Sequence, residues 1–287
     1  MKNINLATIT MCSTDDRDRN MAEAEKLVRR AADGGADWVM LPEIFSFHGS
    51  YSRYYDNADP VNGPLTQQLG ALAKELNICL FAGTIGERPE PHLPKDLLYN
   101  AKQQRRVYNT LLVFDRKGQV AGRYRKVHLF NLKDPGGKPL YCEGDGFIPG
   151  DDPVVIMLEG YRVGLSICYD LRFPEYYSRL SARQPLDVIA LPSAFTRATG
   201  EAHWELLLRA RAVEQQCYVF SSNQCGVHGP GKESWGHSMI VDPWGKVLAD
   251  TGDKPGVAGA VMEPATIAAV RGRLPALQNR RPEIYGP

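Results

Sequence analysis

The sequence has no excess of one charge and no long apolar run. Its 287 residues include 34 Lys and Arg against 33 Asp and Glu, so the net charge is close to zero. This balance argues against a nucleic-acid-binding protein and against a polybasic membrane protein. No apolar stretch approaches the roughly 18 residues that a membrane span needs. The first apolar segment is interrupted by Asn5 and by threonines, unlike a signal peptide. We therefore expect a cytoplasmic protein with neither a membrane nor a nucleic-acid partner.

Cysteine pairs and linkers are also missing. The six cysteines are scattered and none forms a Cys-x-x-Cys pair, which favours a reduced protein over a disulfide framework and gives no structural zinc site. No Pro/Gly/Ser linker, tandem repeat or low-complexity segment divides the chain. A guide of about 150 residues per domain would suggest two domains, but α/β folds often reach this length as one. We expect one domain over residues 1–287, with a core over about 4–265 and a C-terminal tail over about 266–287.

Apolar strand-like segments alternate with helical ones, which predicts a layered α/β protein. Hairpin signals exclude a purely parallel arrangement. The pattern alone favours one mixed sheet, although βαβ-like units followed by a hairpin in each half leave two sheets open. A long loop rich in Gly, Pro and Asp is predicted over 131–150. The predicted strands are 4–12, 38–41, 78–84, 107–114, 120–124, 154–158, 162–167, 188–191, 217–222, 239–241, 247–249 and 257–262, and the predicted helices are 21–31, 65–76, 174–183, 203–216 and a short one after 262.

Cys168 stands at the end of the apolar strand 163–168, and the polar turn that follows cannot continue that strand. A thiol in this position is held on a rigid edge of the sheet. Two further strand ends carry complementary groups, because Glu43 follows one strand and Lys126 follows another. A carboxylate, an amine and a thiol at three strand ends indicate a hydrolase with a thiol nucleophile.

These three side chains have the chemistry that amide hydrolysis requires. A free thiol has a pKa of about 8.5, so it needs a base to become a nucleophile, and Glu43 is the candidate base. Lys126 and the backbone N–H of Tyr169 are candidates to stabilise the oxyanion that forms when Cys168 attacks the amide carbon. Water would then hydrolyse the resulting thioester. These roles require no metal and no organic cofactor.

Each residue alone also has a simpler interpretation. A lone cysteine after an apolar strand is usually a small buried hydrophobe. Glu43 alone is typical of a surface acid at a strand end, and Lys126 alone of a solvated basic turn. Their combination favours the enzyme. A non-catalytic scaffold stays open as an alternative, and a redox-sensing thiol is weaker because no resolving cysteine is nearby in the sequence.

The segments around these residues resemble the nitrilase superfamily of carbon–nitrogen hydrolases. Leu41–Glu43 is similar to its glutamate motif, Arg125–Leu129 to its lysine motif and Ser166–Glu175 to its cysteine motif. The resemblance covers nearly the whole chain. It implies a four-layer α-β-β-α sandwich of two mixed sheets, which usually dimerises, so we expect a homodimer or a larger homo-oligomer with contacts in the C-terminal tail. It also implies a second glutamate, Glu143, that orients Lys126 or protonates the leaving amine; a loop-surface acid is the alternative.

Further segments resemble the Nit branch of this superfamily, and most of all the deaminated glutathione amidases. Those enzymes cleave N-(4-oxoglutaryl)cysteinylglycine to 2-oxoglutarate and cysteinylglycine. The sister ω-amidases, which act on 2-oxoglutaramate, are the alternative, and true nitrilases are more distant. The segments that carry this resemblance are Phe195–Glu205, Leu208–Val219, Gly236–Gly245 and Asn279–Gly286.

A substrate of this class carries carboxylates, so a cation should meet it. Arg172 is the first candidate because a guanidinium binds a carboxylate through two hydrogen bonds; a salt bridge to Glu175 or Asp170 is the alternative. Phe195 and Thr196 follow the next strand and are candidates to line the same cavity, together with Tyr169.

Overall fold

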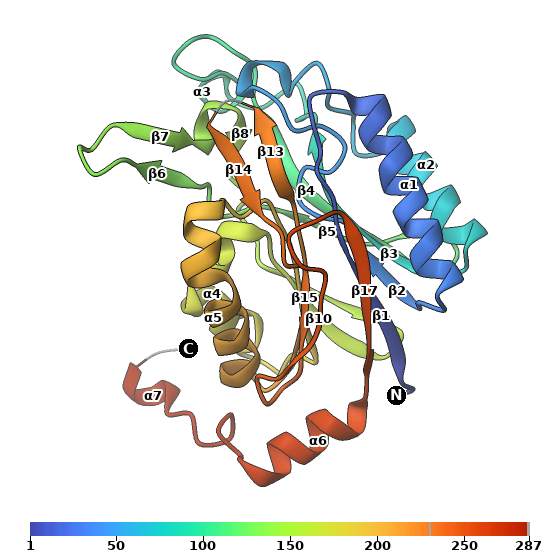
Figure 1. Cartoon of the computed structure of the whole chain (residues 1–287). Coiled ribbons are helices and arrows are strands. Elements are labelled where there is room, and N and C mark those ends of the chain that lie inside the picture. Colours follow the sequence, from blue (N-terminus) through green and yellow to red (C-terminus); the bar gives the residue numbers. More distant parts are fainter. Residues whose placement is uncertain (230, 286–287) are drawn as a thin grey trace.

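The computed structural model describes residues 1–229 and 231–285; positions 230, 286 and 287, the last two in the predicted tail, lie outside the described residues. Two β-sheets stack face to face between two layers of helices (Figure 1). Helices α1 (Arg17–Asp33) and α2 (Pro64–Glu75) cover the first sheet. Helices α4 (Pro174–Leu180) and α5 (Arg197–Gln215) cover the second. The expected four-layer sandwich is confirmed, and the single mixed sheet favoured by the pattern alone is wrong.

The first sheet contains both the first and the last strand of the chain. Its order is β17-β1-β2-β3-β4-β5, with β8 paired to β4. Strands β1, β2 and β3 are parallel, whereas the others in this order pair antiparallel. The late strand β17 pairs with β1 from Ile4–Met262 to Thr10–Gly256. The strands are β1 (Ile4–Thr10), β2 (Trp38–Met40), β3 (Cys79–Glu87), β4 (Val107–Phe114), β5 (Val120–Arg125), β8 (Phe147–Ile148) and β17 (Gly256–Met262).

The second sheet has the order β16-β15-β12-β11-β10-β9. Its central strands β10, β11 and β12 are parallel, so their carboxyl ends meet at one edge. Both faces of these strands are covered, which explains why the sequence reads as nearly continuous apolar runs there. The strands are β9 (Val154–Leu158), β10 (Tyr161–Leu165), β11 (Val188–Ser193), β12 (Tyr218–Asn223), β15 (Met239–Val241) and β16 (Val247–Asp250).

The core between the sheets is aromatic. The ring centroids of Trp38 and Phe81 are 5.6 Å apart, and those of Phe81 and Phe220 are 5.5 Å apart in an edge-to-face arrangement. All three side chains are fully buried. Aromatic pairs in such geometry contribute about 0.5–1.5 kcal/mol beyond the burial of their area. This packing fixes the two sheets relative to each other. It therefore also fixes the relative positions of the strand ends where Glu43, Lys126 and Cys168 lie.

Several elements differ from their predicted form. The predicted loop 131–150 contains a hairpin of β6 (Asn131–Lys133) and β7 (Pro139–Cys142), a 3₁₀ turn (Glu143–Asp145) and β8. Strands β6 and β7 are largely exposed, so they lack the apolar alternation that identifies a strand, and the buried β8 is only two residues long. Helix α5 begins at Arg197 rather than at 203, and its first turn, Arg197–Gly200, carries no large apolar side chain that would extend the helical period. The sequence also gave no signal for a second hairpin, β13 (Cys225–Gly229) and β14 (Lys232–Trp235), or for the short helix α3 (Lys95–Leu98).

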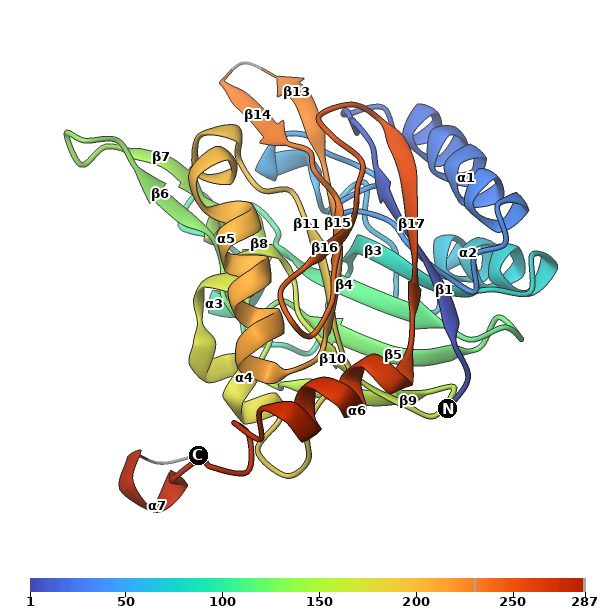
Figure 2. The ribbon, with the colours of Figure 1, turned by 60° about the horizontal axis from the view of Figure 1, so that its bottom comes forward.

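The C-terminal tail crosses the ends of the helices in the second helical layer (Figure 2). Helix α6 (Pro264–Arg273) follows β17, and α7 (Pro282–Tyr285) lies beyond it. The Arg271 guanidinium donates to the Gln216 carbonyl, and the Arg280 guanidinium donates to the Ser181 hydroxyl at 3.0 Å. In the described part of the chain, no helix has both the length and the apolar character that a membrane crossing requires.

Candidate active site

Glu43, Lys126 and Cys168 each follow a strand end, and the two sheets bring these ends together. Cys168 opens a 3₁₀ turn (Cys168–Arg172) after β10 with a φ of 47°, in the left-handed region. Such a conformation costs a non-glycine residue about 1–3 kcal/mol and persists only where its surroundings impose it. Here the Asp170 carboxylate accepts the Ile167 N–H at 2.8 Å and closes the turn. The thiol is thereby fixed at the edge of the second sheet.

Lys126 lies between two carboxylates. Its Nζ donates to Glu43 Oε1 at 2.8 Å and lies 2.8 Å from Glu143 Oε2. The exposed fraction of the side chain is 1% for Lys126, 4% for Glu43 and 8% for Glu143, so water replaces none of these contacts. The structure therefore brings three of the predicted residues into one buried cluster.

Neutral donors complete the binding of both carboxylates. The Asn109 side-chain Nδ2 donates to Glu43 Oε1 at 2.8 Å and to Glu143 Oε1 at 3.2 Å. The Ala194 N–H donates to Glu43 Oε2 at 2.7 Å, and the Phe130 N–H donates to Glu143 Oε2 at 2.6 Å. Each carboxylate is thus held by one ammonium, one amide side chain and one backbone N–H, which fixes its orientation.

The charges of this cluster set its protonation. Burial, the largest influence, raises the pKa of the Cys168 thiol well above its usual value; Glu43 raises it further and Lys126 opposes both. Burial lowers the pKa of the Lys126 ammonium, but Glu143 and Glu43 more than offset this and hold it well above its usual value. Burial also raises the pKa of Glu143, against the opposing charge of Lys126. The resting site therefore holds a neutral thiol beside a protonated lysine.

Asp170 ties the cysteine turn to the segment that carries Lys126. This fully buried carboxylate accepts the Tyr124 hydroxyl at 2.7 Å and the His128 Nδ1–H at 2.7 Å. The His128 ring also stacks on Phe173, with ring centroids 3.8 Å apart. These contacts occupy His128 in positioning the two segments.

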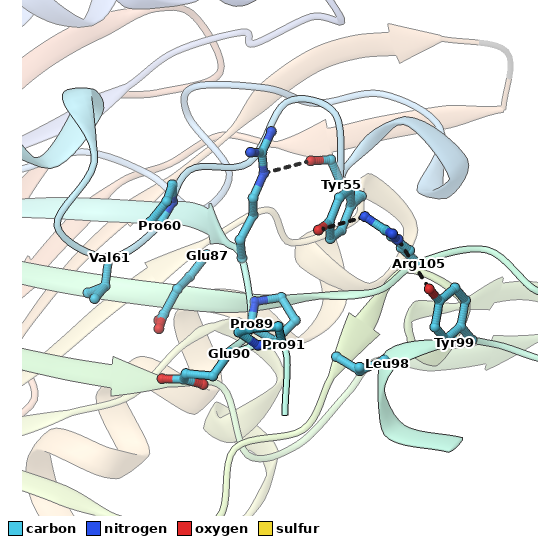
Figure 3. Close-up of a pocket in the computed structure, with 11 residues that line it drawn as sticks. Tyr55, Pro60, Val61, Glu87, Pro89, Glu90, Pro91, Leu98, Tyr99 and Arg105 are labelled. Atoms are coloured by element: carbon cyan, nitrogen blue, oxygen red, sulfur yellow. Dashed lines mark hydrogen bonds between the residues drawn. The ribbon is translucent and has the colours of Figure 1, made fainter. Parts of the chain in front are cut away.

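The cavity beside this cluster is about 60 Å³ in volume. A smaller cavity of about 10 Å³ adjoins it, and Phe130, Cys168, Ala194 and Thr196 line both. A larger cavity of about 500 Å³ lies elsewhere, between Tyr55, the end of β3 and Arg105 (Figure 3). The larger cavity is lined by none of Glu43, Lys126, Glu143 and Cys168, and its Arg105 already donates to the Tyr55 hydroxyl at 3.0 Å. The candidate site is therefore the smaller pair of cavities around Cys168.

The sequence comparisons agree with this geometry. The sequence model of the "Carbon-nitrogen hydrolase" family matches residues 5–272. The chain belongs to the carbon-nitrogen hydrolase family. The predicted resemblance is confirmed, and the protein is accordingly a hydrolase of carbon–nitrogen bonds.

Individual relatives of this carbon-nitrogen hydrolase cover nearly its whole length. It is 38% identical over 285 residues to the human deaminated glutathione amidase, covering 98% of this chain and 83% of that protein. The Caenorhabditis elegans NitFhit protein is 34% identical with a TM-score of 0.87, covering 99% of this chain, which spans 66% of the NitFhit chain. An amidase mutant from Nesterenkonia sp. AN1, 26% identical with a TM-score of 0.76 and coverages of 98% and 95%, shows covalent addition of the acetamide moiety of fluoroacetamide at its active site cysteine.

The predicted substrate-contact residues of this carbon-nitrogen hydrolase all line the smaller cavity. Arg172 lies 5.0 Å from the centroid of the Phe195 ring and donates to His203 Nδ1 at 3.4 Å. Among the described residues it forms neither of the ion pairs weighed as alternatives, with Glu175 or Asp170. Tyr169 and Thr196 complete this wall.

Sequence reasoning missed two parts of the site. Asn109 interrupts the apolar strand 107–114, and this buried polar position was the available signal. Lys232 lies on the unpredicted hairpin and lines the larger of the two cavities, together with His48. Within residues 1–229 and 231–285, no three His, Cys, Asp or Glu side chains are arranged to hold a metal ion.

Proposed function

We propose that the protein is an amidase in which Cys168 is the nucleophile, Glu43 the general base and Lys126 the oxyanion-stabilising cation. The observation that carries this proposal is the buried Lys126 between Glu43 and Glu143, beside the thiol. Because the thiol is neutral at rest, its proton must leave as the sulfur attacks, and Glu43 is the neighbouring base. Transfer from Cys168 to Glu43 leaves the summed charge of the buried cluster unchanged, so no new net charge is created away from water.

The later steps use the same groups. Attack on the amide carbon gives a tetrahedral oxyanion, which the Lys126 ammonium and the Tyr169 backbone N–H stabilise. The proton on Glu43 passes to the leaving nitrogen, the amine departs and a Cys168 thioester remains. Water then gives a proton to Glu43 as its oxygen attacks the thioester carbon. The C–S bond breaks, the acid is released, and Glu43 returns the proton to the Cys168 sulfur. In this proposal Glu143 holds Lys126 in place, supported by their 2.8 Å contact.

For the substrate we propose deaminated glutathione, which the enzyme would hydrolyse to 2-oxoglutarate and cysteinylglycine. The support is the human deaminated glutathione amidase, which is 38% identical and aligns with 98% of this chain. We expect kcat/KM to be at least about tenfold higher on N-(4-oxoglutaryl)cysteinylglycine than on 2-oxoglutaramate, a difference of about 1.4 kcal/mol in transition-state stabilisation. Coupled detection of 2-oxoglutarate measures both reactions. A higher efficiency on 2-oxoglutaramate would reject this substrate in favour of the ω-amidase alternative.

We also propose that residues 1–287 form one domain that assembles as a cytoplasmic homodimer, with contacts from α5 and the tail. Support comes from apolar side chains left exposed on α5, where Leu206 is 66% and Val213 47% exposed. Light scattering is expected to give twice the 31.9 kDa of one chain, and the double substitution Leu206→Glu with Val213→Glu is expected to give one chain. A monomeric wild-type protein at micromolar concentration would contradict the dimer.

A further inference from the structure

Lys232 is a half-buried cation that reaches the cavity of the catalytic cluster without an acidic partner. It lies on β14 and lines the same cavity as Cys168. Its ammonium lies 5.0 Å from the centroid of the Tyr51 ring. Across residues 1–229 and 231–285, it forms no ion pair within 4.0 Å. A cation withdrawn from water in this way gains free energy when an anion binds beside it.

The groups next to Lys232 are neutral or already paired. His48 and His228 stack with ring centroids 3.9 Å apart, and burial, the largest influence on each, lowers the pKa of both imidazoles. Both rings are therefore neutral at neutral pH. The adjacent Glu233 is held by Arg197 at 3.2 Å. Burial also lowers the pKa of Lys232 itself, which a bound anion would reverse.

The second cavity beside Cys168 also contains a cation. Arg172 lines the smaller cavity, also without an ion pair among the described residues. Glu43 and Glu143 place two carboxyl groups against the single ammonium of Lys126, so the cluster itself offers an anionic substrate no unpaired cation. Lys232 in one cavity and Arg172 in the other each supply a cation for one carboxylate of a substrate that has two.

We infer that Lys232 binds the glycine carboxylate of deaminated glutathione and so selects this substrate over 2-oxoglutaramate. The inference rests on the proposed function. Deaminated glutathione has two carboxylates, one beside the oxo group and one on its C-terminal glycine, whereas 2-oxoglutaramate has only the first. The glycine carboxylate is the more distant from the scissile carbonyl, across a cysteine residue and a second amide.

The positions of the two cations along the chain suit these two arms. Arg172 belongs to the same 3₁₀ turn as Cys168 and lines the smaller cavity, which suits the shorter oxo-acid arm. Lys232 belongs to a separate hairpin and lines the other cavity beside Cys168, which suits the longer cysteinylglycine arm.

The test compares wild type, Lys232→Met and Lys232→Arg on three substrates: deaminated glutathione, its C-terminal glycinamide and 2-oxoglutaramate. Lys232→Met is expected to lower kcat/KM on deaminated glutathione about 10- to 100-fold, mainly through KM, and to change 2-oxoglutaramate turnover by less than about twofold. The glycinamide is expected to show the same loss with wild type and no further loss with Lys232→Met, as a double-mutant cycle requires for one shared contact. Lys232→Arg retains the charge and is expected to retain most of the activity.

Two results would overturn the inference. An equal loss on deaminated glutathione and 2-oxoglutaramate would place Lys232 at the shared oxo-acid arm or in the fold, and an unchanged kcat/KM on deaminated glutathione would remove it from substrate binding. Both outcomes leave the proposed function intact. Failure of the wild type to cleave deaminated glutathione would instead overturn the proposed function, and this inference with it.

Discussion

Replacing Cys168 with alanine is expected to lower kcat at least about 10⁴-fold, because no other group can form the thioester; loss of a nucleophile in comparable hydrolases costs up to about 10⁶-fold. The fold is expected to remain. Alanine keeps the Cβ of Cys168, so the strain of the positive φ is unchanged, and the lost thiol costs no more than about 1–2 kcal/mol of unfolding free energy. The measurements are kcat on the amide substrate and a urea unfolding curve.

Cys217→Ala is the matched control for this substitution. Cys217 is another fully buried thiol, just before β12, whose pKa burial also raises, to about 12, but it lines neither cavity around Cys168. The control is expected to keep wild-type kcat within about twofold, with a similar small loss of stability. Wild-type turnover by Cys168→Ala, in a sample free of contaminating hydrolase, would contradict the proposed mechanism.

Replacing Lys126 with methionine is expected to lower the unfolding free energy by about 3–5 kcal/mol at pH 7, the cost of removing one partner from a buried ion pair. Methionine fills much of the same volume, but Glu43 and Glu143 then face each other without a cation, held only by Asn109 and backbone N–H groups. Hydrolysis is expected to fall by at least about 10²-fold as the oxyanion loses its donor. Urea unfolding and kcat measure the two effects.

The stability deficit of Lys126→Met is expected to shrink as the pH falls. Burial and Glu43 already raise the pKa of Glu143, and loss of Lys126 removes the main opposing influence. A carboxyl whose pKa is higher in the folded than in the unfolded state binds more protons when folded, so the folded state gains stability as the pH falls from 7 towards the unfolded value of about 4.3. Lys232→Met serves as the control, because its half-buried side chain forms no ion pair and its loss should cost less than about 1 kcal/mol. A deficit independent of pH would mean that the two carboxylates do not carry the effect.

The sequence predicts the reacting side chains better than the groups that hold them. Glu43, Lys126 and Cys168 follow apolar runs, so their positions at strand ends are readable from local pattern. Asn109 and Asp170 act through contacts with residues distant in the sequence, and no periodicity encodes such contacts. The local pattern left one sheet and two sheets both open, and the family resemblance favoured two, because hydrophobic periodicity identifies a strand but not its neighbours. Lys232 was missed because its hairpin is short and polar.

The site is divided between the two halves of the sandwich. Glu43 and Lys126 follow strands of the first sheet, whereas Cys168 and Ala194 follow strands of the second. The Glu43 N–H donates to the Ser193 carbonyl at 3.3 Å, and the Ala194 N–H returns a bond to the Glu43 carboxylate. Neither sheet holds both the base and the nucleophile. Turnover therefore reports that the sheets are docked, and any partly folded form with only one sheet assembled is inert towards the amide.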